Sequence, residues 1–554
     1  MPLPTAWNLL VFRDGRRVLN GPDLLQALQQ ELHSLLSISD FSPQCAYEKL
    51  IEALLRSGEL ECALADHAAC DPAADTLTRL TDQLALALSG RFRPKLPSTI
   101  LDRLSALDVP QTLVASVPEG FCYYALHPLD YADLLDENAI DAPAVAVVGI
   151  RSIGTTLSSV VRAWFELRGI PAERITVRPT GHPFDRTLSL PEREQRWIAK
   201  GLGRGALFLI VDEGPGLSGS SFLAVAEALA QAGVPPDRIL FLPSSKPDLS
   251  SLLAPDAARR WSGFKTIPLK PTRRIPRDAD KDIGWGEWRN TVFANEHDWP
   301  GVWAWTERRK FRSSDQRSLF RFDGHGHYGN AVRFRAQVLA EHGWGPATCA
   351  AGGGFSRYSW ITADRPTHID RHTVLQLARY CAFRAACFAH PSPSSDALEH
   401  MAQINLERAL DVSHSIVLPI ERPVIADARM MPYEWIVTSN GGLLKVDSAS
   451  HGDDHFYPGP TDIAWDLAGA ITEWKLDQEA SGLLVGEYKR ISGDAIEKRL
   501  GPYLVAYGAF RLGFTLSAAR SVNDAGEGAR FQQEAESYRR ALQTLIPTAG
   551  LVEA

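Results

Sequence analysis

The sequence contains little that could crosslink, anchor or export the chain. Its 554 residues include only seven cysteines, and no two of them form a Cys-x-x-Cys pair, which argues against a disulfide framework or a zinc ribbon. No apolar stretch approaches the length of a membrane span. Residues 1–7 lack the basic start and the apolar run of a signal peptide. We therefore expect a cytoplasmic protein with reduced thiols and no membrane partner.

The chain also lacks an excess of basic residues. Its 58 lysines and arginines are outnumbered by 66 acidic residues, which gives a formal net charge of −8. Such a balance argues against a general nucleic-acid binder. The length predicts two or three domains, each large enough for its own core, and it leaves a homo-oligomer open.

The most informative segment that is present runs from Leu207 to Phe222. Five apolar residues lead into Asp212 and Glu213, and a loop of small residues with an apolar helical pattern follows. A buried parallel strand that ends in such a loop and opens a helix is typical of a phosphate site, because N–H groups point at the anion. No Gly-Lys-Ser/Thr follows, so this is not a P-loop. Another kind of βα nucleotide-binding crossover remains an alternative.

This segment resembles the ribose-phosphate loop of type I phosphoribosyltransferases. The resemblance implies that Asp212 and Glu213 hold the ribose hydroxyls of phosphoribosyl pyrophosphate and act in catalysis. The loop is one residue longer than is usual in the family, and it has serine in place of threonine. The residues implied to grip the 5′-phosphate are Gly216, Ser218, Gly219, Ser220 and Ser221.

Two further strand-and-loop units extend the resemblance over residues 101–270. The strand that begins at Ala144 enters a turn similar to the family's pyrophosphate loop, with Arg151 as the cation for the leaving group. Donors to the same group would be Gly154, Thr155 and Thr156. Repeated βα units of this kind predict a parallel sheet, with the ligand at the carboxyl ends of its strands.

A third strand ends at Arg178 and leads into a segment where orotate-type members have a mobile basic loop. There Arg178 and Arg186 would close over the substrate, although the lysine common in that loop is absent. The resemblance implies Mg²⁺ as the metal, bound through the hard oxygen ligands that it prefers.

The overall pattern divides the chain into four regions. Residues 1–100 carry helical periodicity without chemistry and are interpreted as a helical N-terminal cap. The polar, Pro/Gly-rich residues 271–289 are expected to form a linker between residues 101–270 and residues 290–554. The predicted fold class is α/β: a parallel-sheet phosphoribosyltransferase fold plus an α+β kinase-like domain, with a helical N-terminal region.

The last region resembles the aminoglycoside-phosphotransferase and choline-kinase branch of the protein-kinase fold. The shared order is a loop acid, a hairpin with a strong turn signal at Asn440-Gly441, a second acid and an Asp-x-Ala-x-Asp-Leu-Ala helix start. The resemblance implies that Asp427 is the base and that Asp447 and Glu434 are the metal-binding positions. It also implies that Arg321 contacts phosphate and that Asp462 and Asp466 organise the loop.

Two other patterns in this region compete with that interpretation. His451-Gly452-Asp453 reads like the family's catalytic triplet and gives an alternative register with Asp453 as the base, although no hairpin follows it. The run from Gly324 to Gly329 matches G-x-G-x-x-G, but no strand with a ribose-binding acid follows. A tight turn is therefore the simpler interpretation of that run.

Together these resemblances predict a Mg²⁺-dependent phosphoribosyltransferase fused to an ATP-dependent, kinase-like domain for small molecules. The expected partners are phosphoribosyl pyrophosphate, ATP and an unidentified acceptor that resembles a nucleobase or a nucleoside. The alternative is a nucleotide-sensing regulatory protein with catalytically degenerate domains. Turnover of phosphoribosyl pyrophosphate separates the two, because a sensor binds it without releasing pyrophosphate.

Overall fold

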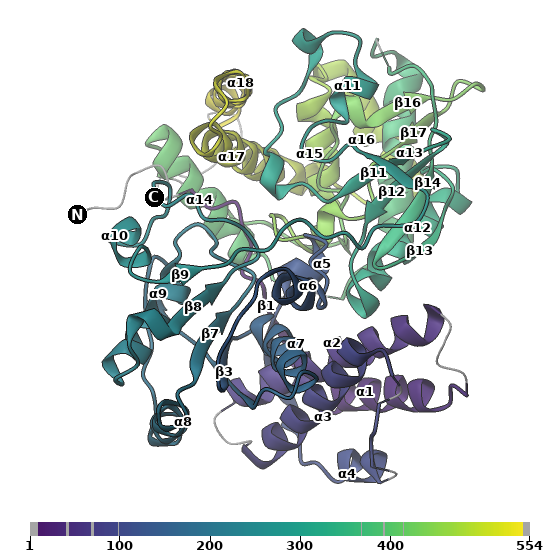
Figure 1. Cartoon of the computed structure of the whole chain (residues 1–554). Coiled ribbons are helices and arrows are strands. Elements are labelled where there is room, and N and C mark those ends of the chain that lie inside the picture. The colour runs from purple at the N-terminus through teal and green to yellow at the C-terminus, as the bar shows by residue number, and fades with distance from the viewer. Residues whose placement is uncertain are drawn as a thin grey trace.

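The fold is described here from a computed structural model, drawn as a cartoon in Figure 1. Residues 1–7, on which the signal-peptide prediction depends, lie outside the described part of the chain. The described residues are 9–39, 44–67, 71–92, 94–97, 99–366, 368–391, 394–413 and 415–546.

A five-stranded parallel sheet occupies the middle of the first half. Its strand order is β4-β3-β7-β8-β9, and every neighbouring pair is parallel, as the alternating βα pattern predicts. The central strands are apolar throughout because helices cover both faces of the sheet (Figure 1). The strands are β3 (Val145–Ile150), β4 (Ala172–Val177), β7 (Leu207–Val211), β8 (Ile239–Leu242) and β9 (Lys265–Thr266). The remaining elements are α7 (Gly154–Glu166), β5 (Thr180–His182), β6 (Asp185–Thr187), α8 (Glu192–Gly203), α9 (Ser220–Gln231) and α10 (Ala257–Trp261).

The N-terminal helices share one hydrophobic core with this sheet. Leu54 of α2 and Leu84 of α3 are buried in the same cluster as Val147 of β3 and Leu157 of α7. The predicted boundary near residue 100 therefore lies within one shared core, and the N-terminal helices form a layer on one face of the sheet. The elements of this layer are β1 (Arg16–Asn20), α1 (Gly21–Leu36), α2 (Gln44–Asp66), α3 (Asp71–Gly90), α4 (Ile100–Ser105), β2 (Thr112–Ser116), α5 (Glu119–Cys122) and α6 (Asp130–Glu137).

An antiparallel sheet opens the second half. Its order is β10-β11-β12-β14-β13, and one long helix, α12, stands between the third and fourth strands in the chain. The first strand falls inside residues 271–289, so the predicted linker contributes to this sheet. Its bounds and those of its neighbours are β10 (Ala279–Asp282), α11 (Arg289–Val292), β11 (Lys310–Ser313), β12 (Ser318–Phe322), α12 (Asn330–Glu341), β13 (Thr348–Gly352) and β14 (Phe355–Ser359).

Helices form most of the remainder. Trp435, Trp465 and Tyr503 are fully buried in one large cluster around α15 and α17. The predicted hairpin around Asn440-Gly441 is present as β16 and β17. The elements are α13 (Arg371–Cys387), α14 (Asp396–Leu410), β15 (Pro423–Val424), β16 (Trp435–Val437), β17 (Leu443–Lys445), β18 (Thr461–Asp462), α15 (Ala464–Glu473), α16 (Gln478–Ser492), α17 (Glu497–Ser521) and α18 (Ala525–Leu545).

Specific contacts join the two halves. The G-x-G-x-x-G run of residues 324–329 is a short helical turn at this junction. His325 N donates to the carbonyl of Phe121, and His327 Nε2 lies 3.1 Å from Glu59 Oε2. Near the N-terminus, the backbone of Leu10 exchanges two hydrogen bonds with the amide of Asn405. The run therefore acts as a domain contact, in agreement with its interpretation as a tight turn.

Candidate functional site

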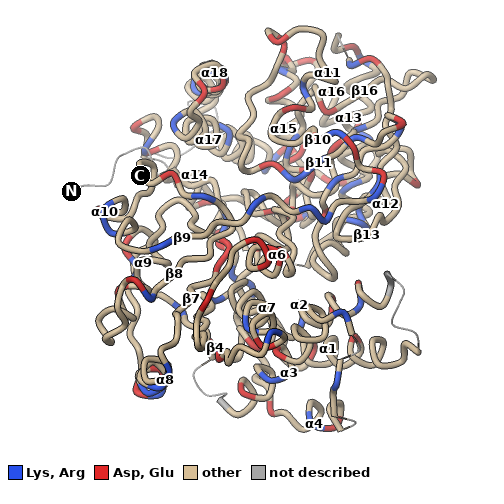
Figure 2. The backbone as a smooth tube through the Cα atoms, viewed as in Figure 1, with Lys and Arg blue, Asp and Glu red and all other residues tan. Residues whose placement is uncertain are grey.

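A cavity of about 340 Å³ lies between the antiparallel sheet and the β16–β17 hairpin. Its lining includes apolar and aromatic side chains such as Ile283, Leu319, Trp360 and Ile436. The same lining contains five basic side chains and three acidic ones. Two of the basic residues, Lys310 and Arg312, lie on β11, where Figure 2 shows basic residues. Apolar walls together with a surplus of cations suit a flat base attached to an anionic group.

Arg321 and Asp447 meet in the lining of this cavity. Arg321, on β12, places Nη1 2.5 Å from Asp447 Oδ1, and its other nitrogens bind Asp323 and Tyr358. Burial opposes ionisation of Asp447, but His451 and Arg321 hold the pKa of this carboxyl well below its usual range. The structure thus brings together two side chains that lie 126 residues apart and that the same resemblance selects.

Asp427 occupies a different environment from the one predicted for a base. Its side chain is fully buried and lines neither cavity described here. Lys445 Nζ lies 2.7 Å from Oδ1, and the Tyr380 hydroxyl donates to Oδ2. Burial alone would raise the pKa of Asp427, but Lys445, His451 and Arg384 lower it to about 2. In this structure the carboxylate holds the loop through Lys445 and Tyr380, and the role of Asp427 as a base remains a prediction.

Lys445 also pairs with the carboxylate of Glu434. Its ammonium lies 2.9 Å from Glu434 Oε2, and Arg429 lies 3.0 Å from Oε1. Glu434 does line the larger cavity, but both of its oxygens contact cations. Its role as a metal ligand remains a prediction. The residue that fixes both acids, Lys445, was missed by the sequence analysis.

Two other acids organise the neighbouring loops. Asp466 accepts hydrogen bonds from the backbone N–H groups of Asp427 and Ala428. Burial raises the pKa of Asp466 to about 6. Asp462 accepts from the N–H groups of Glu421 and Arg422 and contacts Arg499. These contacts are of the kind that the resemblance implies for the two acids.

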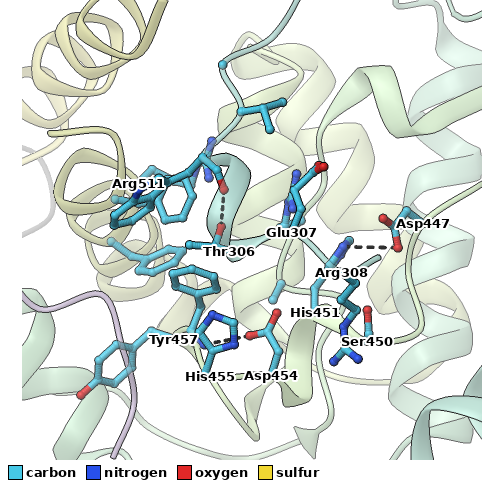
Figure 3. Close-up of a pocket in the computed structure, with 18 of the residues that line it drawn as sticks. Thr306, Glu307, Arg308, Asp447, Ser450, His451, Asp454, His455, Tyr457 and Arg511 are labelled. Carbon is cyan, nitrogen blue, oxygen red and sulfur yellow. Dashed lines mark hydrogen bonds and ion pairs between the residues drawn. The ribbon is translucent and has the colours of Figure 1, made fainter. Parts of the chain in front are cut away.

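A second cavity of about 100 Å³ adjoins the first, and Figure 3 shows its lining. Asp447, Arg321 and Lys310 line both cavities, so they stand at the border between the two. His451 also lines the smaller cavity, with Nε2 3.4 Å from Asp447 Oδ1 and Nδ1 3.6 Å from Asp427 Oδ1. Asp453, the acid of the alternative register, pairs instead with Arg335 at 3.4 Å and lines neither cavity.

The loop that follows β7 has its acids at the carboxyl end of the parallel sheet. Glu213 Oε2 accepts a 2.5 Å hydrogen bond from Gly120 N. Burial raises the pKa of Asp212 to about 7 and that of Glu213 well above its usual value, and it raises the pKa of Glu119 to about 6. Burial thus makes all three carboxyl groups easier to protonate than an exposed carboxyl group.

Two of the small residues in this loop, Ser218 and Ser220, already have hydrogen-bond partners. The hydroxyls of Ser218 and Ser220 both donate to the carbonyl of Pro183, in the turn of the β5–β6 hairpin. Gly219 precedes α9 and has a φ of 70°, a left-handed backbone conformation that a residue with a side chain adopts at a cost in free energy. Gly216 is exposed, and Ser221 lies in the first turn of α9. A phosphate in this loop would have to compete with the hairpin turn.

The predicted pyrophosphate loop is largely occupied. Arg151 and Arg178 both pair with Asp66 of α2, at 3.0 and 2.5 Å. Arg186 donates to the Pro179 carbonyl. Thr155 and Thr156 are buried, and their N–H groups bind backbone carbonyls. Gly154 packs against the backbone of β7, where a Cβ would lie 2.7 Å from the Val211 carbonyl oxygen. These residues pack the helix against the sheet, and their role as donors to a ligand remains a prediction.

Comparisons with known proteins find solved structures that are similar to part of the chain. No family model and no curated protein matches the chain. A choline/ethanolamine kinase family protein from Mesorhizobium loti is similar at 16% identity, over 47% of this chain and 94% of its own, with a TM-score of 0.30. A choline kinase from Streptococcus pneumoniae is similar at 13% identity over 42% and 89%, with a TM-score of 0.28.

An aminoglycoside phosphotransferase from Alicyclobacillus acidocaldarius is similar at 13% identity, over 50% of this chain and 94% of its own, with a TM-score of 0.25. At these identities and TM-scores the similarities carry no argument about activity. Within the described residues, no helix is long and apolar enough to cross a membrane. The same residues include no group of three or more His, Cys, Asp or Glu side chains that could hold a metal ion.

Proposed function

We propose that the cavity of about 340 Å³ binds ATP and that the chain transfers a phosphoryl group to a small molecule in the adjoining cavity. The observation that carries the proposal is the Arg321–Asp447 pair on the wall that both cavities share. Phosphoryl transfer requires positioning and charge compensation more than covalent chemistry. Charged side chains that line both cavities can contribute to each of these.

Individual side chains support this reaction. Arg321 and Lys310 lie where a transferred phosphoryl group would cross from one cavity to the other, and their positive charges would stabilise its oxygens. Asp447 is partly exposed, and with Glu434 it suits Mg²⁺, which usually takes one or two protein carboxylates and completes its shell with phosphate oxygens and water. When bound, this ion would neutralise phosphate charge.

The first test is ATP turnover with a panel of small hydroxyl compounds in the presence of Mg²⁺. We expect Asp447→Asn to lower turnover by about 100-fold or more, because the group that organises the phosphates loses its charge. Glu287→Gln is the control, since it removes a carboxylate charge from an exposed residue that lines neither cavity, and we expect it to retain turnover. Equal loss in the two variants would contradict the proposed site.

One observation favours a second candidate function, which is nucleotide sensing without turnover. Asp427, which the resemblance selects as the base, is fully buried and held by Lys445 and Tyr380. A chain without an accessible base at that position can bind ATP without transferring a phosphoryl group. ATP binding would then act by changing the contacts that the protein makes. ATP binding that depends on Asp447, with no turnover of any acceptor, is the result that this candidate predicts.

A separate proposal concerns the loop of residues 212–221. We propose that it binds phosphoribosyl pyrophosphate, with Asp212 and Glu213 accepting hydrogen bonds from the ribose hydroxyls. The position of both acids at the carboxyl edge of a parallel sheet supports this proposal. The same proposal includes release of pyrophosphate. Arg151 and Arg178 would have to leave Asp66 before they could bind that leaving group.

The pH dependence of that binding tests the loop. The pKa of Asp212 is raised to about 7 from an ordinary 3.8, so the carboxylate that accepts ribose hydroxyls becomes populated as the pH rises through about 7. We expect calorimetry to show tighter binding of phosphoribosyl pyrophosphate at pH 8 than at pH 6, and loss of binding in Asp212→Asn/Glu213→Gln. The proposal fails if that double variant binds as the wild type does.

A further inference from the structure

An unusual turn follows β10 and begins the long connection to β11, which also contains α11. In this turn Trp285 has a φ of 58° and Gly286 a φ of 87°, and a Cβ on Gly286 would lie 2.8 Å from Arg289 Nη2. The turn carries Trp288 to the border of the two cavities, where it is among the residues that line both.

The donors of this turn converge on a carboxylate of the chain itself. Glu307 accepts 2.9 Å hydrogen bonds from Gly286 N and from Trp288 Nε1. Lys310 Nζ lies 3.7 Å from the same carboxylate and 3.8 Å from Asp447. Glu307 lines both cavities, and Figure 3 shows it at the same pocket as Asp447. Backbone N–H, indole N–H and ammonium groups around one anion are the donor set that a phosphate oxygen takes.

We propose that Glu307 occupies the subsite for the terminal phosphates of the nucleotide and thereby determines which nucleotides bind. A triphosphate has to displace this carboxylate from Gly286 and Trp288, or lie beside it with like charges close together. A monophosphate does not reach the subsite and has no such competitor. Glu307 thus selects against nucleotides with more phosphates. The inference rests on the proposed nucleotide function of the larger cavity.

The test compares the binding of ATP, ADP and AMP by calorimetry, at one fixed Mg²⁺ concentration, in the full-length protein. We expect Glu307→Ala to bind ATP about 10-fold more tightly than the wild type, while its affinity for AMP changes less than about 3-fold. Glu307→Gln keeps an oxygen that can accept one of the two N–H groups. It should show the same direction of change even if the alanine variant is unstable.

Glu287→Gln is the matched control. It removes the same charge from the same turn, but Glu287 is exposed and lines neither cavity, so ATP and AMP affinities should both stay as in the wild type. If Glu307→Gln and Glu307→Ala weaken ATP, ADP and AMP equally, the carboxylate only holds the turn and the inference is overturned. If the wild type and all variants bind none of the three, the proposed nucleotide function itself fails.

Discussion

Replacing Lys445 by methionine is expected to lower the free energy of unfolding by about 3–5 kcal/mol. Lys445 is fully buried, and it lies 2.7 Å from Asp427 Oδ1 and 2.9 Å from Glu434 Oε2. It also donates to the carbonyls of Arg429 and Asp447. The variant would leave two buried carboxylates without their shared cation. Urea denaturation at neutral pH, followed by tryptophan fluorescence, measures the change.

The partner variant separates the charge effect from lost packing. In Lys445→Met/Asp427→Asn one of the two stranded charges is gone, so we expect part of the lost stability to return. Because the folded pKa of Asp427 is about 2, below its ordinary 3.8, the stabilisation is present above about pH 4 and lost as the pH falls through about 2. A single variant that loses less than about 1 kcal/mol would show that Lys445 does not hold this network together.

Arg174→Met is expected to cost a similar amount, about 3–5 kcal/mol, for a different part of the fold. The guanidinium is almost fully buried and joins β4 to two helices of the N-terminal layer: it lies 2.8 Å from Glu61 of α2 and 2.5 Å from Asp82 of α3. Its loss would strand Glu61 in the interior and loosen the helical layer from the sheet. Differential scanning calorimetry of the full-length protein measures the effect.

Lys200→Met provides the matched control for that prediction. Lys200 pairs with Glu173 at the surface of the same sheet region, where both side chains are at least 40% exposed. Exposed pairs of this kind contribute about 0–1 kcal/mol. If the Arg174 and Lys200 variants unfold at the same temperature, the N-terminal helices do not depend on this cluster for their attachment to the sheet.

The elements of the parallel sheet could be predicted because their signals are local. The apolar run from Leu207 to Val211 and the small residues after it describe a buried strand and its turn without any knowledge of the remainder. The Asn440-Gly441 turn fixed the hairpin in the same way. By contrast, β10 consists of Ala, Asp, Lys and Asp, which suits a charged edge strand but reads as a linker.

The ion-pair partners of the predicted site residues could not be predicted from the spacing of motifs in the sequence. Arg151 pairs with Asp66, 85 residues earlier, so its availability depends on how α2 packs on the sheet. Asp427 stands at the position that the resemblance selects, but only the folded hairpin brings Lys445 onto it. Glu307 and Lys310 precede or open a strand without a recognisable motif, and their shared position beside Asp447 appears only in three dimensions.

Photolabelling with an azido derivative of ATP tests the central claim most directly, because it reports where the nucleotide lies. The account predicts Mg²⁺-dependent labelling of peptides that contain residues 283–292 or 358–365, because several residues of each segment line the larger cavity. It also predicts that excess ATP suppresses this labelling and that Asp447→Asn loses it. Labelling confined to residues 212–222, or unchanged in Asp447→Asn, would contradict the claim that ATP binds in the larger cavity.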